Sequence, residues 1–259
     1  MSPRAVIFSN QKGGVGKTTL TRELGIYVAS CGHTVLLVDC DPQGNLTKSL
    51  VENTEGGLYE ALTGEGLRLA AVDQKLSLLA GDFRLALLEK SLIGEIDAYT
   101  RLRALFSDST IAAFDFIFLD TPPSLGVLTV NALAASDHLV VPMNPSLYSM
   151  QGTNDLLRTV SKVHANLNPG LSLLGVIINA FDSIPTITRQ IRSEIEGSFG
   201  KKVFATVLSK SIKLEEAIAS RKGVIHHANL GSSRAAEEVK ALGDELLTRL
   251  AAATAEAAS

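Results

Sequence analysis

A glycine-rich segment near the start of the chain carries the residues with the clearest chemistry. Residues 12–19 read K-G-G-V-G-K-T-T, so three glycines lie within four positions and are followed by a lysine and two threonines. Glycine adopts backbone conformations closed to other residues, which lets successive N–H groups turn inward around an anion. In phosphate loops the lysine, here Lys17, reaches the β- and γ-phosphates, and the next hydroxyl, here Thr18, ligates Mg²⁺. A nucleotide is therefore expected at Gly13, Gly14, Val15, Gly16, Lys17, Thr18 and Thr19.

The segments on either side of this loop are those that must position it. Residues 5–8 are an apolar run that predicts a buried strand, and residues 20–29 are apolar at helical spacing. The start of that helix adds a positive dipole end and unpaired N–H groups to the same anion site. A glycine-rich turn without a ligand is the alternative. It is disfavoured because strand, glycines, lysine, hydroxyl and helix follow in the order that phosphate binding requires.

Carboxylates follow two further predicted strands. Asp39 and Asp41 come at the end of a predicted strand over residues 34–38, and Asp120 follows residues 114–119, which are almost wholly apolar. In open parallel sheets ligands bind at the carboxyl ends of strands, so these acids are expected beside the phosphate loop. Asp41 precedes a proline, and the Asp39–Asp41 pair could instead be a helix cap and a turn residue.

Taken together, these motifs resemble the ParA/MinD family of ATPases, and its ParA/Soj type in particular. The general phosphate-loop motif fails by one residue, since Gln11 lies where its first glycine belongs, while Lys12 is an additional lysine. That departure is similar to the deviant Walker A loop of the family. Residues 38–45 read V-D-C-D-P-Q-G-N and residues 120–126 read D-T-P-P-S-L-G, and both resemble the family's two switch segments.

The resemblance implies a role for each motif residue. Lys12 would reach across a nucleotide-sandwich dimer to the partner's phosphates, and Asp41 would align or polarise the attacking water. The residues implied around Mg²⁺ are Thr18, Asp39 and Asp120, and the implied catalytic residues are Lys12, Lys17 and Asp41.

Alternating strands and helices predict an α/β fold with a doubly wound, mostly parallel sheet, which is the P-loop NTPase fold of the deviant Walker A class. We expect one ATPase domain over residues 1–259. The predicted strands also include residues 75–81, 139–143, 173–178 and 202–205, and the predicted helices include residues 58–62, 84–106, 212–217 and a closing helix over residues 233–253.

A base-binding residue and a DNA-binding surface are implied by the same resemblance. Asn179 follows a predicted strand where a guanine reader would have N-K-x-D, and the lysine of that motif is missing here. The resemblance to the family implies adenine instead, with Asn179 near the base. Residues 206–217 resemble the region before the family's DNA-binding face. The candidate DNA contacts are Lys210, Lys213, Arg221 and Lys222. Ser146 replaces a glutamate of many relatives, and Ile184 lies where some have an arginine.

The charge of the chain is small but uneven. The formal net charge is −3, and residues 183–222 carry eight bases against four acids, which makes this segment +4 and the remainder −7. Such asymmetry fits either an anionic partner or a solvated surface. No run of about 18 apolar residues and no separate signal region is visible, so a cytoplasmic, nucleoid-associated protein is expected. The two cysteines, Cys31 and Cys40, are expected to be buried.

We therefore expect a ParA-like ATPase that uses ATP and Mg²⁺, pairs into a homodimer on ATP, binds DNA without sequence preference and partitions plasmid or chromosome DNA. A ParB-like adaptor would stimulate hydrolysis. A ParA-like protein that positions a chemoreceptor array or carboxysome, a MinD-like membrane-cycling ATPase and a metabolic ligase are the alternatives. The closing helix lacks the basic, bulky apolar character of a membrane anchor, and no membrane partner is expected. An iron–sulfur reductase would need cysteines after Asp120, and the chain has none there.

Overall fold

The computed structural model describes the backbone of residues 3–145, 149–181 and 185–257. Side chains are described within residues 3–145, 153–179 and 190–255. Ser146 and Ile184, at which the sequence departs from the resembled family, lie outside the described residues, as does the side chain of Arg189.

The apolar runs of the sequence form a single sheet. Its strands are β1 (Arg4–Phe8), β2 (Val35–Asp39), β3 (Ala70–Asp73), β4 (Leu76–Leu79), β5 (Phe116–Asp120), β6 (His138–Met143), β7 (Ser172–Phe181) and β8 (Leu208–Ser209). They lie in the order β3-β4-β2-β5-β1-β6-β7-β8, and only the pairing of β3 with β4 is antiparallel among the described strands. Every residue of β2 and β5 is buried, as parallel strands covered on both faces require. The predicted doubly wound, mostly parallel fold is confirmed.

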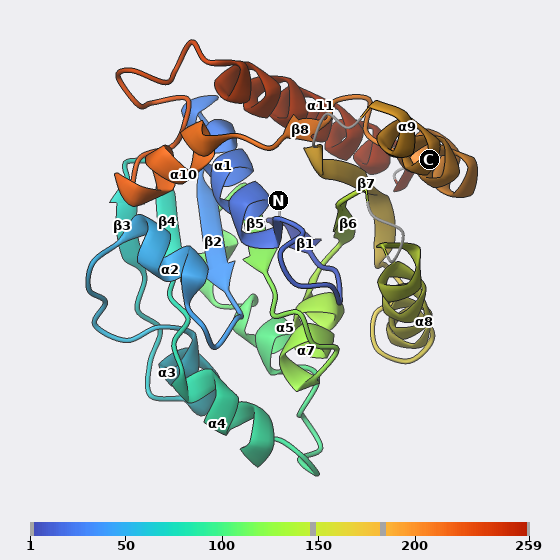
Figure 1. Cartoon of the computed structure of the whole chain (residues 1–259). Helices are drawn as coiled ribbons and strands as arrows, with labels where there is room; N and C mark the ends of the chain where they lie inside the picture. The colour runs from blue at the N-terminus through green and yellow to red at the C-terminus, as the bar shows by residue number, and fades with distance from the viewer. Residues whose placement is uncertain (1–2, 146–148, 182–184, 258–259) are drawn as a thin grey trace.

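Helices cover both faces of this sheet (Figure 1). Figure 1 shows α11 crossing the top of the molecule above α1, with α3 and α4 at the opposite end. The helices are α1 (Lys17–Ser30), α2 (Asn45–Leu50), α3 (Leu58–Thr63), α4 (Arg84–Ser91), α5 (Arg101–Leu105), α6 (Ser109–Ala112), α7 (Val127–Ala135), α8 (Ser149–Asn166), α9 (Pro185–Phe199), α10 (Ile212–Ala219) and α11 (Arg234–Ala257), with a 3₁₀ turn, η1, at Gly200–Lys202.

The core has two halves because successive residues of a strand point to opposite faces of the sheet. Ile7 of β1 and Ile117 of β5 pack in one apolar cluster with buried residues of α4, α5 and α7. Val6 and Phe118, from the same two strands, pack in a second cluster with α1, α10 and α11. Helix α1 is thereby held firmly on one face, which positions the loop that precedes it.

The structure corrects three expectations and adds one strand that was not predicted. Residues 84–106 do not form one helix, because turns separate α4 from α5 and Gly94 takes a φ of 93° within them. Residues 202–205 are not a strand, since only Val203 forms a bridge and the last strand is β8. Strand β3, which pairs with β4 across a tight turn, was not predicted. Cys31 is exposed, whereas Cys40 is buried as expected.

Candidate nucleotide-binding site

The predicted site residues meet at one edge of the sheet. Strands β1, β2 and β5 are neighbours, and their registers pair Phe8 with Asp120 and Asp39 with Asp120. The three strands therefore end at the same level. The loop after β1, the acids after β2 and the acid that ends β5 are brought together there, although they are far apart in the chain.

Two of the three glycines of the loop have backbone conformations that favour glycine. Gly14 and Gly16 have φ values of 70° and 86°, in the left-handed region, and Gly16 is the residue before the first turn of α1. A Cβ atom on Gly16 would lie 1.8 Å from Nδ2 of Asn179. Any side chain at position 16 would therefore displace Asn179 as well as strain the loop.

Three asparagines hold the loop, and two of them were not found by sequence reasoning. Nδ2 of Asn10 donates to the carbonyl of Pro142 at 2.7 Å, and Nδ2 of Asn144 donates to the carbonyl of Gly14 at 3.1 Å. Asn179, the predicted base-binding residue, donates from Nδ2 to the carbonyl of Val15 at 2.8 Å. Asn10 and Asn144 each follow a buried strand, and that position was the one available signal.

Lys17 is turned back into the loop. Its Nζ donates to the carbonyl of Lys12 at 3.2 Å, and only 6% of the residue is exposed. Burial lowers the pKa of Lys17, while the negative charges of Asp120 and Asp41 act in the opposite direction. A buried cation at a loop rich in backbone N–H groups favours a bound polyanion. Lys12 is half-buried at the mouth of the same loop.

Thr18 and Asp120 form the part of the site that fits Mg²⁺. Oγ1 of Thr18 donates to Oδ2 of Asp120 at 2.6 Å, and Asp120 is fully buried. The other carboxylate oxygen, Oδ1, is buried and has no hydrogen-bond partner among the described residues. Burial, together with the charge of Asp39, raises the pKa of Asp120 well above its ordinary range. A divalent cation would satisfy the orphaned oxygen and favour the ionised form.

No group of three or more His, Cys, Asp or Glu residues within the described part of the chain is arranged to hold a metal ion. Mg²⁺ commonly binds through one or two carboxylates, with phosphate oxygens and water as its other ligands. The Thr18 hydroxyl and the Asp120 carboxylate fit that pattern, so these two residues would hold the ion beside a phosphate.

Asp39 has its carboxylate oxygens engaged by the protein. Oδ2 accepts from the backbone N and from Oγ1 of Thr47 at 2.8 and 2.7 Å, and Oδ1 accepts from the backbone N of Asp41 at 3.2 Å. Burial raises the pKa of Asp39 to about 6 in spite of these bonds. This geometry lets Asp39 act on the metal site indirectly, by holding the turn that carries Asp41. Thr47 was not anticipated from the sequence.

Asp41 is 8% exposed, and its Oδ1 accepts from the backbone N of Gln43 at 2.9 Å. This bond is that of an Asx turn, so the turn-forming interpretation of Asp41 also describes the geometry. Its negative charge is close enough to raise the pKa of Lys17, which favours the protonated lysine. The position is therefore compatible with a group that approaches a γ-phosphate held by Lys17.

A cavity of about 430 Å³ extends from the loop along the end of β7. Gly14, Gly16, Asn144 and Asn179 line one side, and residues 209–211 with Leu214 of α10 line the other. A volume in this range suits a small organic ligand. The nucleoside half of a nucleotide whose phosphates lie in the loop would extend here. Lys210, predicted to contact DNA, lines this cavity.

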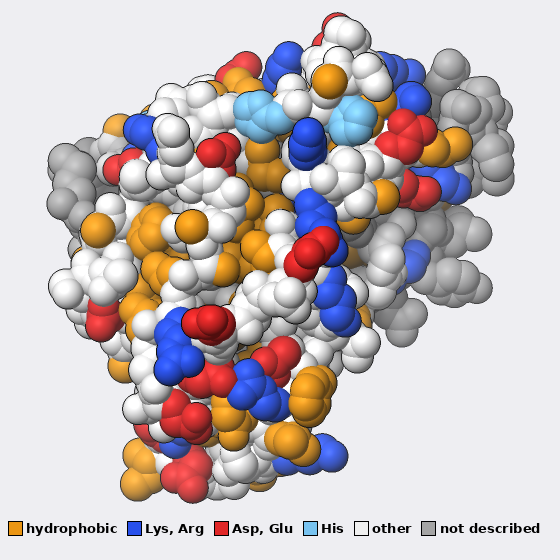
Figure 2. Space-filling model, turned by 90° about the vertical axis from the view of Figure 1, so that its left-hand side faces the viewer, with side chains coloured by type: hydrophobic (Ala, Val, Ile, Leu, Met, Phe, Trp, Pro, Cys, Tyr) orange, Lys and Arg blue, Asp and Glu red, His pale blue; other side chains and the backbone are white. Residues whose placement is uncertain are grey.

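The other predicted DNA contacts are exposed and lie on or just after α10. Lys213 forms an ion pair with Glu216 at 3.0 Å, and Arg221 forms one with Glu52. Lys222 is exposed. Figure 2, which views the molecule from the left-hand side of Figure 1, shows Lys and Arg side chains interleaved with Asp and Glu on this face. The structure thus brings the phosphate, metal and base candidates together, but it spreads the predicted DNA contacts along a mixed surface.

The chain is similar in sequence to one family model and to several known proteins. A family model described as an AAA domain matches residues 3–173. The chromosome-partitioning ATPase Soj of Thermus thermophilus is 38% identical over 251 residues, which cover 95% of this chain and 96% of that protein. The chromosome partitioning protein ParA of Myxococcus xanthus is 36% identical over 253 residues, covering 95% and 88%.

Among solved structures, the crystal structure of cobyrinic acid a,c-diamide synthase from Mycobacterium smegmatis with a bound ATP analogue and magnesium superposes with a TM-score of 0.83. It is 30% identical and covers 95% of this chain and 94% of its own. Its fold is that of the present sheet and helices. No helix in the described ranges 3–145, 149–181 and 185–257 is both long and apolar enough to cross a membrane.

Proposed function

The chain belongs to the Soj/ParA family of chromosome-partitioning ATPases, and from that premise we propose that it couples ATP hydrolysis to the partitioning of plasmid or chromosome DNA. It is an ATPase with ATP and Mg²⁺ as cofactors. The observation that carries the assignment of the site is the orphaned Oδ1 of Asp120 beside the Thr18 hydroxyl, at the foot of the phosphate loop.

Each residue of the site has a role in this proposal. Lys17 leaves its contact with the Lys12 carbonyl and neutralises the β- and γ-phosphates, because a strong anion replaces a neutral acceptor. Thr18 and Asp120 hold Mg²⁺, which neutralises developing charge on the phosphates when bound. Asp41 orients the water. Asp39 fixes the turn that carries Asp41, because it accepts hydrogen bonds from the backbone N of Asp41 and from Thr47. Asn179 gives up its hydrogen bond to the carbonyl of Val15 and forms one to the adenine base instead.

Dimerisation on ATP is the second part of the proposal. Lys12 lies at the mouth of the loop, and its backbone N donates a hydrogen bond to Oδ1 of Asn10 at 3.1 Å. We infer that its side chain reaches the phosphates bound by a second copy. Two chains would then complete two sites, which makes pairing depend on the γ-phosphate.

DNA binding and stimulation by a ParB-like adaptor complete the cycle we propose. The relatives are named for chromosome partitioning, and the excess positive charge of residues 183–222 supplies a surface for phosphates. Lys210, Lys213, Arg221 and Lys222 are all exposed, and Lys210 also lines the cavity. The protein would act at the nucleoid. The same cycle could carry a protein cargo instead of DNA, and the stimulating partner decides which.

A membrane-cycling role is less well supported. The apolar residues Leu242, Leu246 and Leu250 of α11 are fully buried in the core cluster that contains α1. Their side chains are committed to folding, so the apolar face of this helix is not presented to a lipid surface.

A metabolic ligase is the second candidate, and the name of the Mycobacterium smegmatis structure favours it. Its identity of 30% is lower than the 38% and 36% of the partitioning proteins. An amide-forming ligase would consume ATP only with a carboxylic acid and an amino donor. ATP turnover that needs both of these, and that DNA and adaptor do not change, would replace the partitioning proposal.

The experiment that tests the site compares Lys17→Ala with the natural protein. Without the lysine we expect nucleotide binding to be lost, because Lys17 supplies the mobile cation proposed for the β- and γ-phosphates. The measurement is a titration with a fluorescent ATP analogue, with phosphate release and molar mass followed in parallel. Unchanged affinity in Lys17→Ala would refute the proposed loop.

A further inference from the structure

A second cavity lies on the other side of the first turn of α1, between α1, α2 and α10. Its volume is about 410 Å³. It shares Thr19 and Ile218 with the cavity proposed for the nucleoside, and it also reaches Thr18. A molecule in this second cavity would therefore lie next to the nucleotide without occupying the nucleotide's own place.

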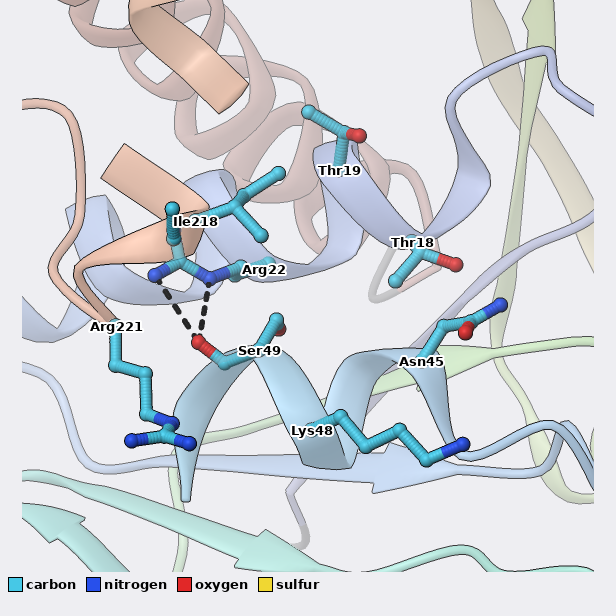
Figure 3. A pocket seen from close by; sticks show the side chains of 9 residues that line it. Thr18, Thr19, Arg22, Asn45, Lys48, Ser49, Ile218 and Arg221 are labelled. Atoms are coloured by element: carbon cyan, nitrogen blue, oxygen red, sulfur yellow. Dashed lines mark hydrogen bonds between the residues drawn. The ribbon is translucent and has the colours of Figure 1, made fainter. Parts of the chain in front are cut away.

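The lining of this cavity is basic. Arg22, Lys48 and Arg221 contribute side chains to it, and no acidic residue is among those that line it within the described chain. Figure 3 shows Lys48 on α2 and Arg221 at the end of the ribbon that follows α10, with Arg22 of α1 and Ile218 of α10 above them. Arg22 is fully buried and forms an ion pair with Glu23, so its charge is balanced inside the protein. The charges open to a ligand are those of Lys48 and Arg221.

The interactions that Lys48 and Arg221 make within the protein are easily exchanged. Nζ of Lys48 is exposed and donates to the carbonyl of Gln43 at 2.7 Å. Arg221 pairs with Glu52, and these side chains are 42% and 72% exposed. Ion pairs at such exposure contribute little to stability. One bond to Glu52 also uses only one of the five N–H donors of a guanidinium.

The backbone at Arg221 is the strongest sign that its side chain has a function. Arg221 has a φ of 54° and is the one non-glycine residue with positive φ among those described. Its N–H donates to the carbonyl of Ile218, and that of Lys222 donates to the carbonyl of Ala217, which together form the Schellman ending of α10. Glycine is the residue that this position favours, because it has no Cβ. An arginine at this position strains the backbone, and a strained residue that persists indicates that its side chain has a function, here the binding of a ligand by its guanidinium.

We propose that this cavity is a second anion-binding site, which takes a small phosphate-bearing compound held between Lys48 and Arg221. Arginine suits the site because its planar fork can bind two phosphate oxygens at once. Ile218 provides an apolar surface for the rest of the compound. Since Thr18 and Thr19 border the cavity, the bound anion would change the affinity for the nucleotide, and the nucleotide would change the affinity for the anion by the same factor.

Pyrophosphate is the minimal probe, and the phosphate loop must be filled first because it also binds phosphates. The full-length protein is saturated with ADP at constant magnesium, and pyrophosphate is titrated by calorimetry at constant ionic strength. We expect one additional site per chain. Arg221→Gly and Lys48→Ala should each weaken it at least tenfold. Lys240→Ala is the control, because it removes one positive charge at an exposed position of α11 outside the cavity, and it should change the affinity less than threefold.

A second measurement separates binding from folding. Arg221→Gly keeps the left-handed ending of α10 and relieves its strain, so its urea midpoint should be equal to or higher than that of the natural protein. Absence of a pyrophosphate site, or equal affinity in the natural protein, Arg221→Gly and Lys48→Ala, would overturn the proposal. The proposal would also be overturned if pyrophosphate did not bind but duplex DNA bound with an affinity that both Arg221→Gly and Lys48→Ala reduce. Arg221 and Lys48 would then belong to a DNA-binding surface.

Discussion

At the scale of single residues, the site depends on where two lysines and three aspartates place their charges. Lys17 and Asp120 are buried at the foot of one loop, and Asp41 lies at its edge. Lys12 lies at the mouth of the loop, and we propose that it contacts the phosphates bound by a second copy of the chain.

Lys12→Gln should bind nucleotide as a monomer but lose ATP turnover, because the charge it delivers to a second copy is missing while Lys17 is retained. Binding is measured with a fluorescent ADP, and turnover by phosphate release over a range of protein concentrations. Turnover at the natural rate, independent of protein concentration, would show that the lysine does not act between subunits.

Asp41→Ala should bind ATP and accumulate as a dimer, while hydrolysis falls by about 10²-fold or more, since loss of a group that orients or activates water has effects of this size. Light scattering with ATP reports the dimer, and single-turnover phosphate release reports the chemistry. If hydrolysis is unaffected, the role passes to another acid, and Asp39 is the next candidate.

At the scale of elements, Asp39 is the link between β2 and α2. Its folded pKa of about 6 lies above the ordinary aspartate value near 4. Between these values the folded protein binds more protons than the unfolded chain, so the stability from this group is complete below about pH 4 and is lost as the pH rises to 6.

In the absence of nucleotide and metal, the free energy of unfolding should therefore decrease between pH 4 and 6, with at most about 1.4 kcal/mol per pH unit from one proton. Urea unfolding at several pH values measures it. Asp39→Asn should flatten this decrease, and the same slope in both proteins would show that Asp39 does not titrate in this range.

Helix α11 is a structural element in this account. Leu246 is fully buried against the cluster that includes α1, so Leu246→Ala should lower the free energy of unfolding by about 2–5 kcal/mol. Thr248→Ala, at an exposed position on the same helix, should change it by less than about 0.5 kcal/mol. Equal stability of both variants would mean that α11 does not pack on the core, and would reopen the membrane-cycling alternative.

At the scale of the whole molecule, DNA binding should require two chains. One chain of net charge −3 offers few cations on a mixed surface, whereas pairing doubles the phosphate contacts. The logarithm of affinity falls with the logarithm of salt concentration in proportion to those contacts. Binding with ATP should therefore be tighter and more dependent on salt than binding with ADP or without nucleotide.

Lys213→Glu should weaken DNA binding for all sequences alike while ATP binding and dimerisation persist. Lys240→Glu, the same charge reversal at an exposed position of α11 outside residues 183–222, is the control. The measurement is a titration of duplex DNA in the three nucleotide states at two salt concentrations. Equal affinity in all three states would remove the nucleotide switch from DNA binding.

The sequence by itself determined the features whose physical cause is local. Glycines followed by a lysine and a threonine predict a phosphate loop, because the backbone freedom of glycine is a property of the residue itself. Continuous apolar runs predict parallel strands that are buried on both faces, because the run can be read from residues adjacent in the sequence. Apolar spacing predicts one helix over residues 84–106, but the turns between α4 and α5 are set by packing and by Gly94, which apolar spacing does not reveal.

Only the tertiary structure decided which side chains meet. Asn10, Asn144 and Thr47 carry ordinary polar groups. They are part of the site because the sheet order brings the carboxyl ends of β1, β6 and β2 close to one another. The left-handed Arg221 at the mouth of a second cavity could not be foreseen either. Contacts between residues distant in sequence depend on the register and order of strands, and no local pattern of residues contains that information.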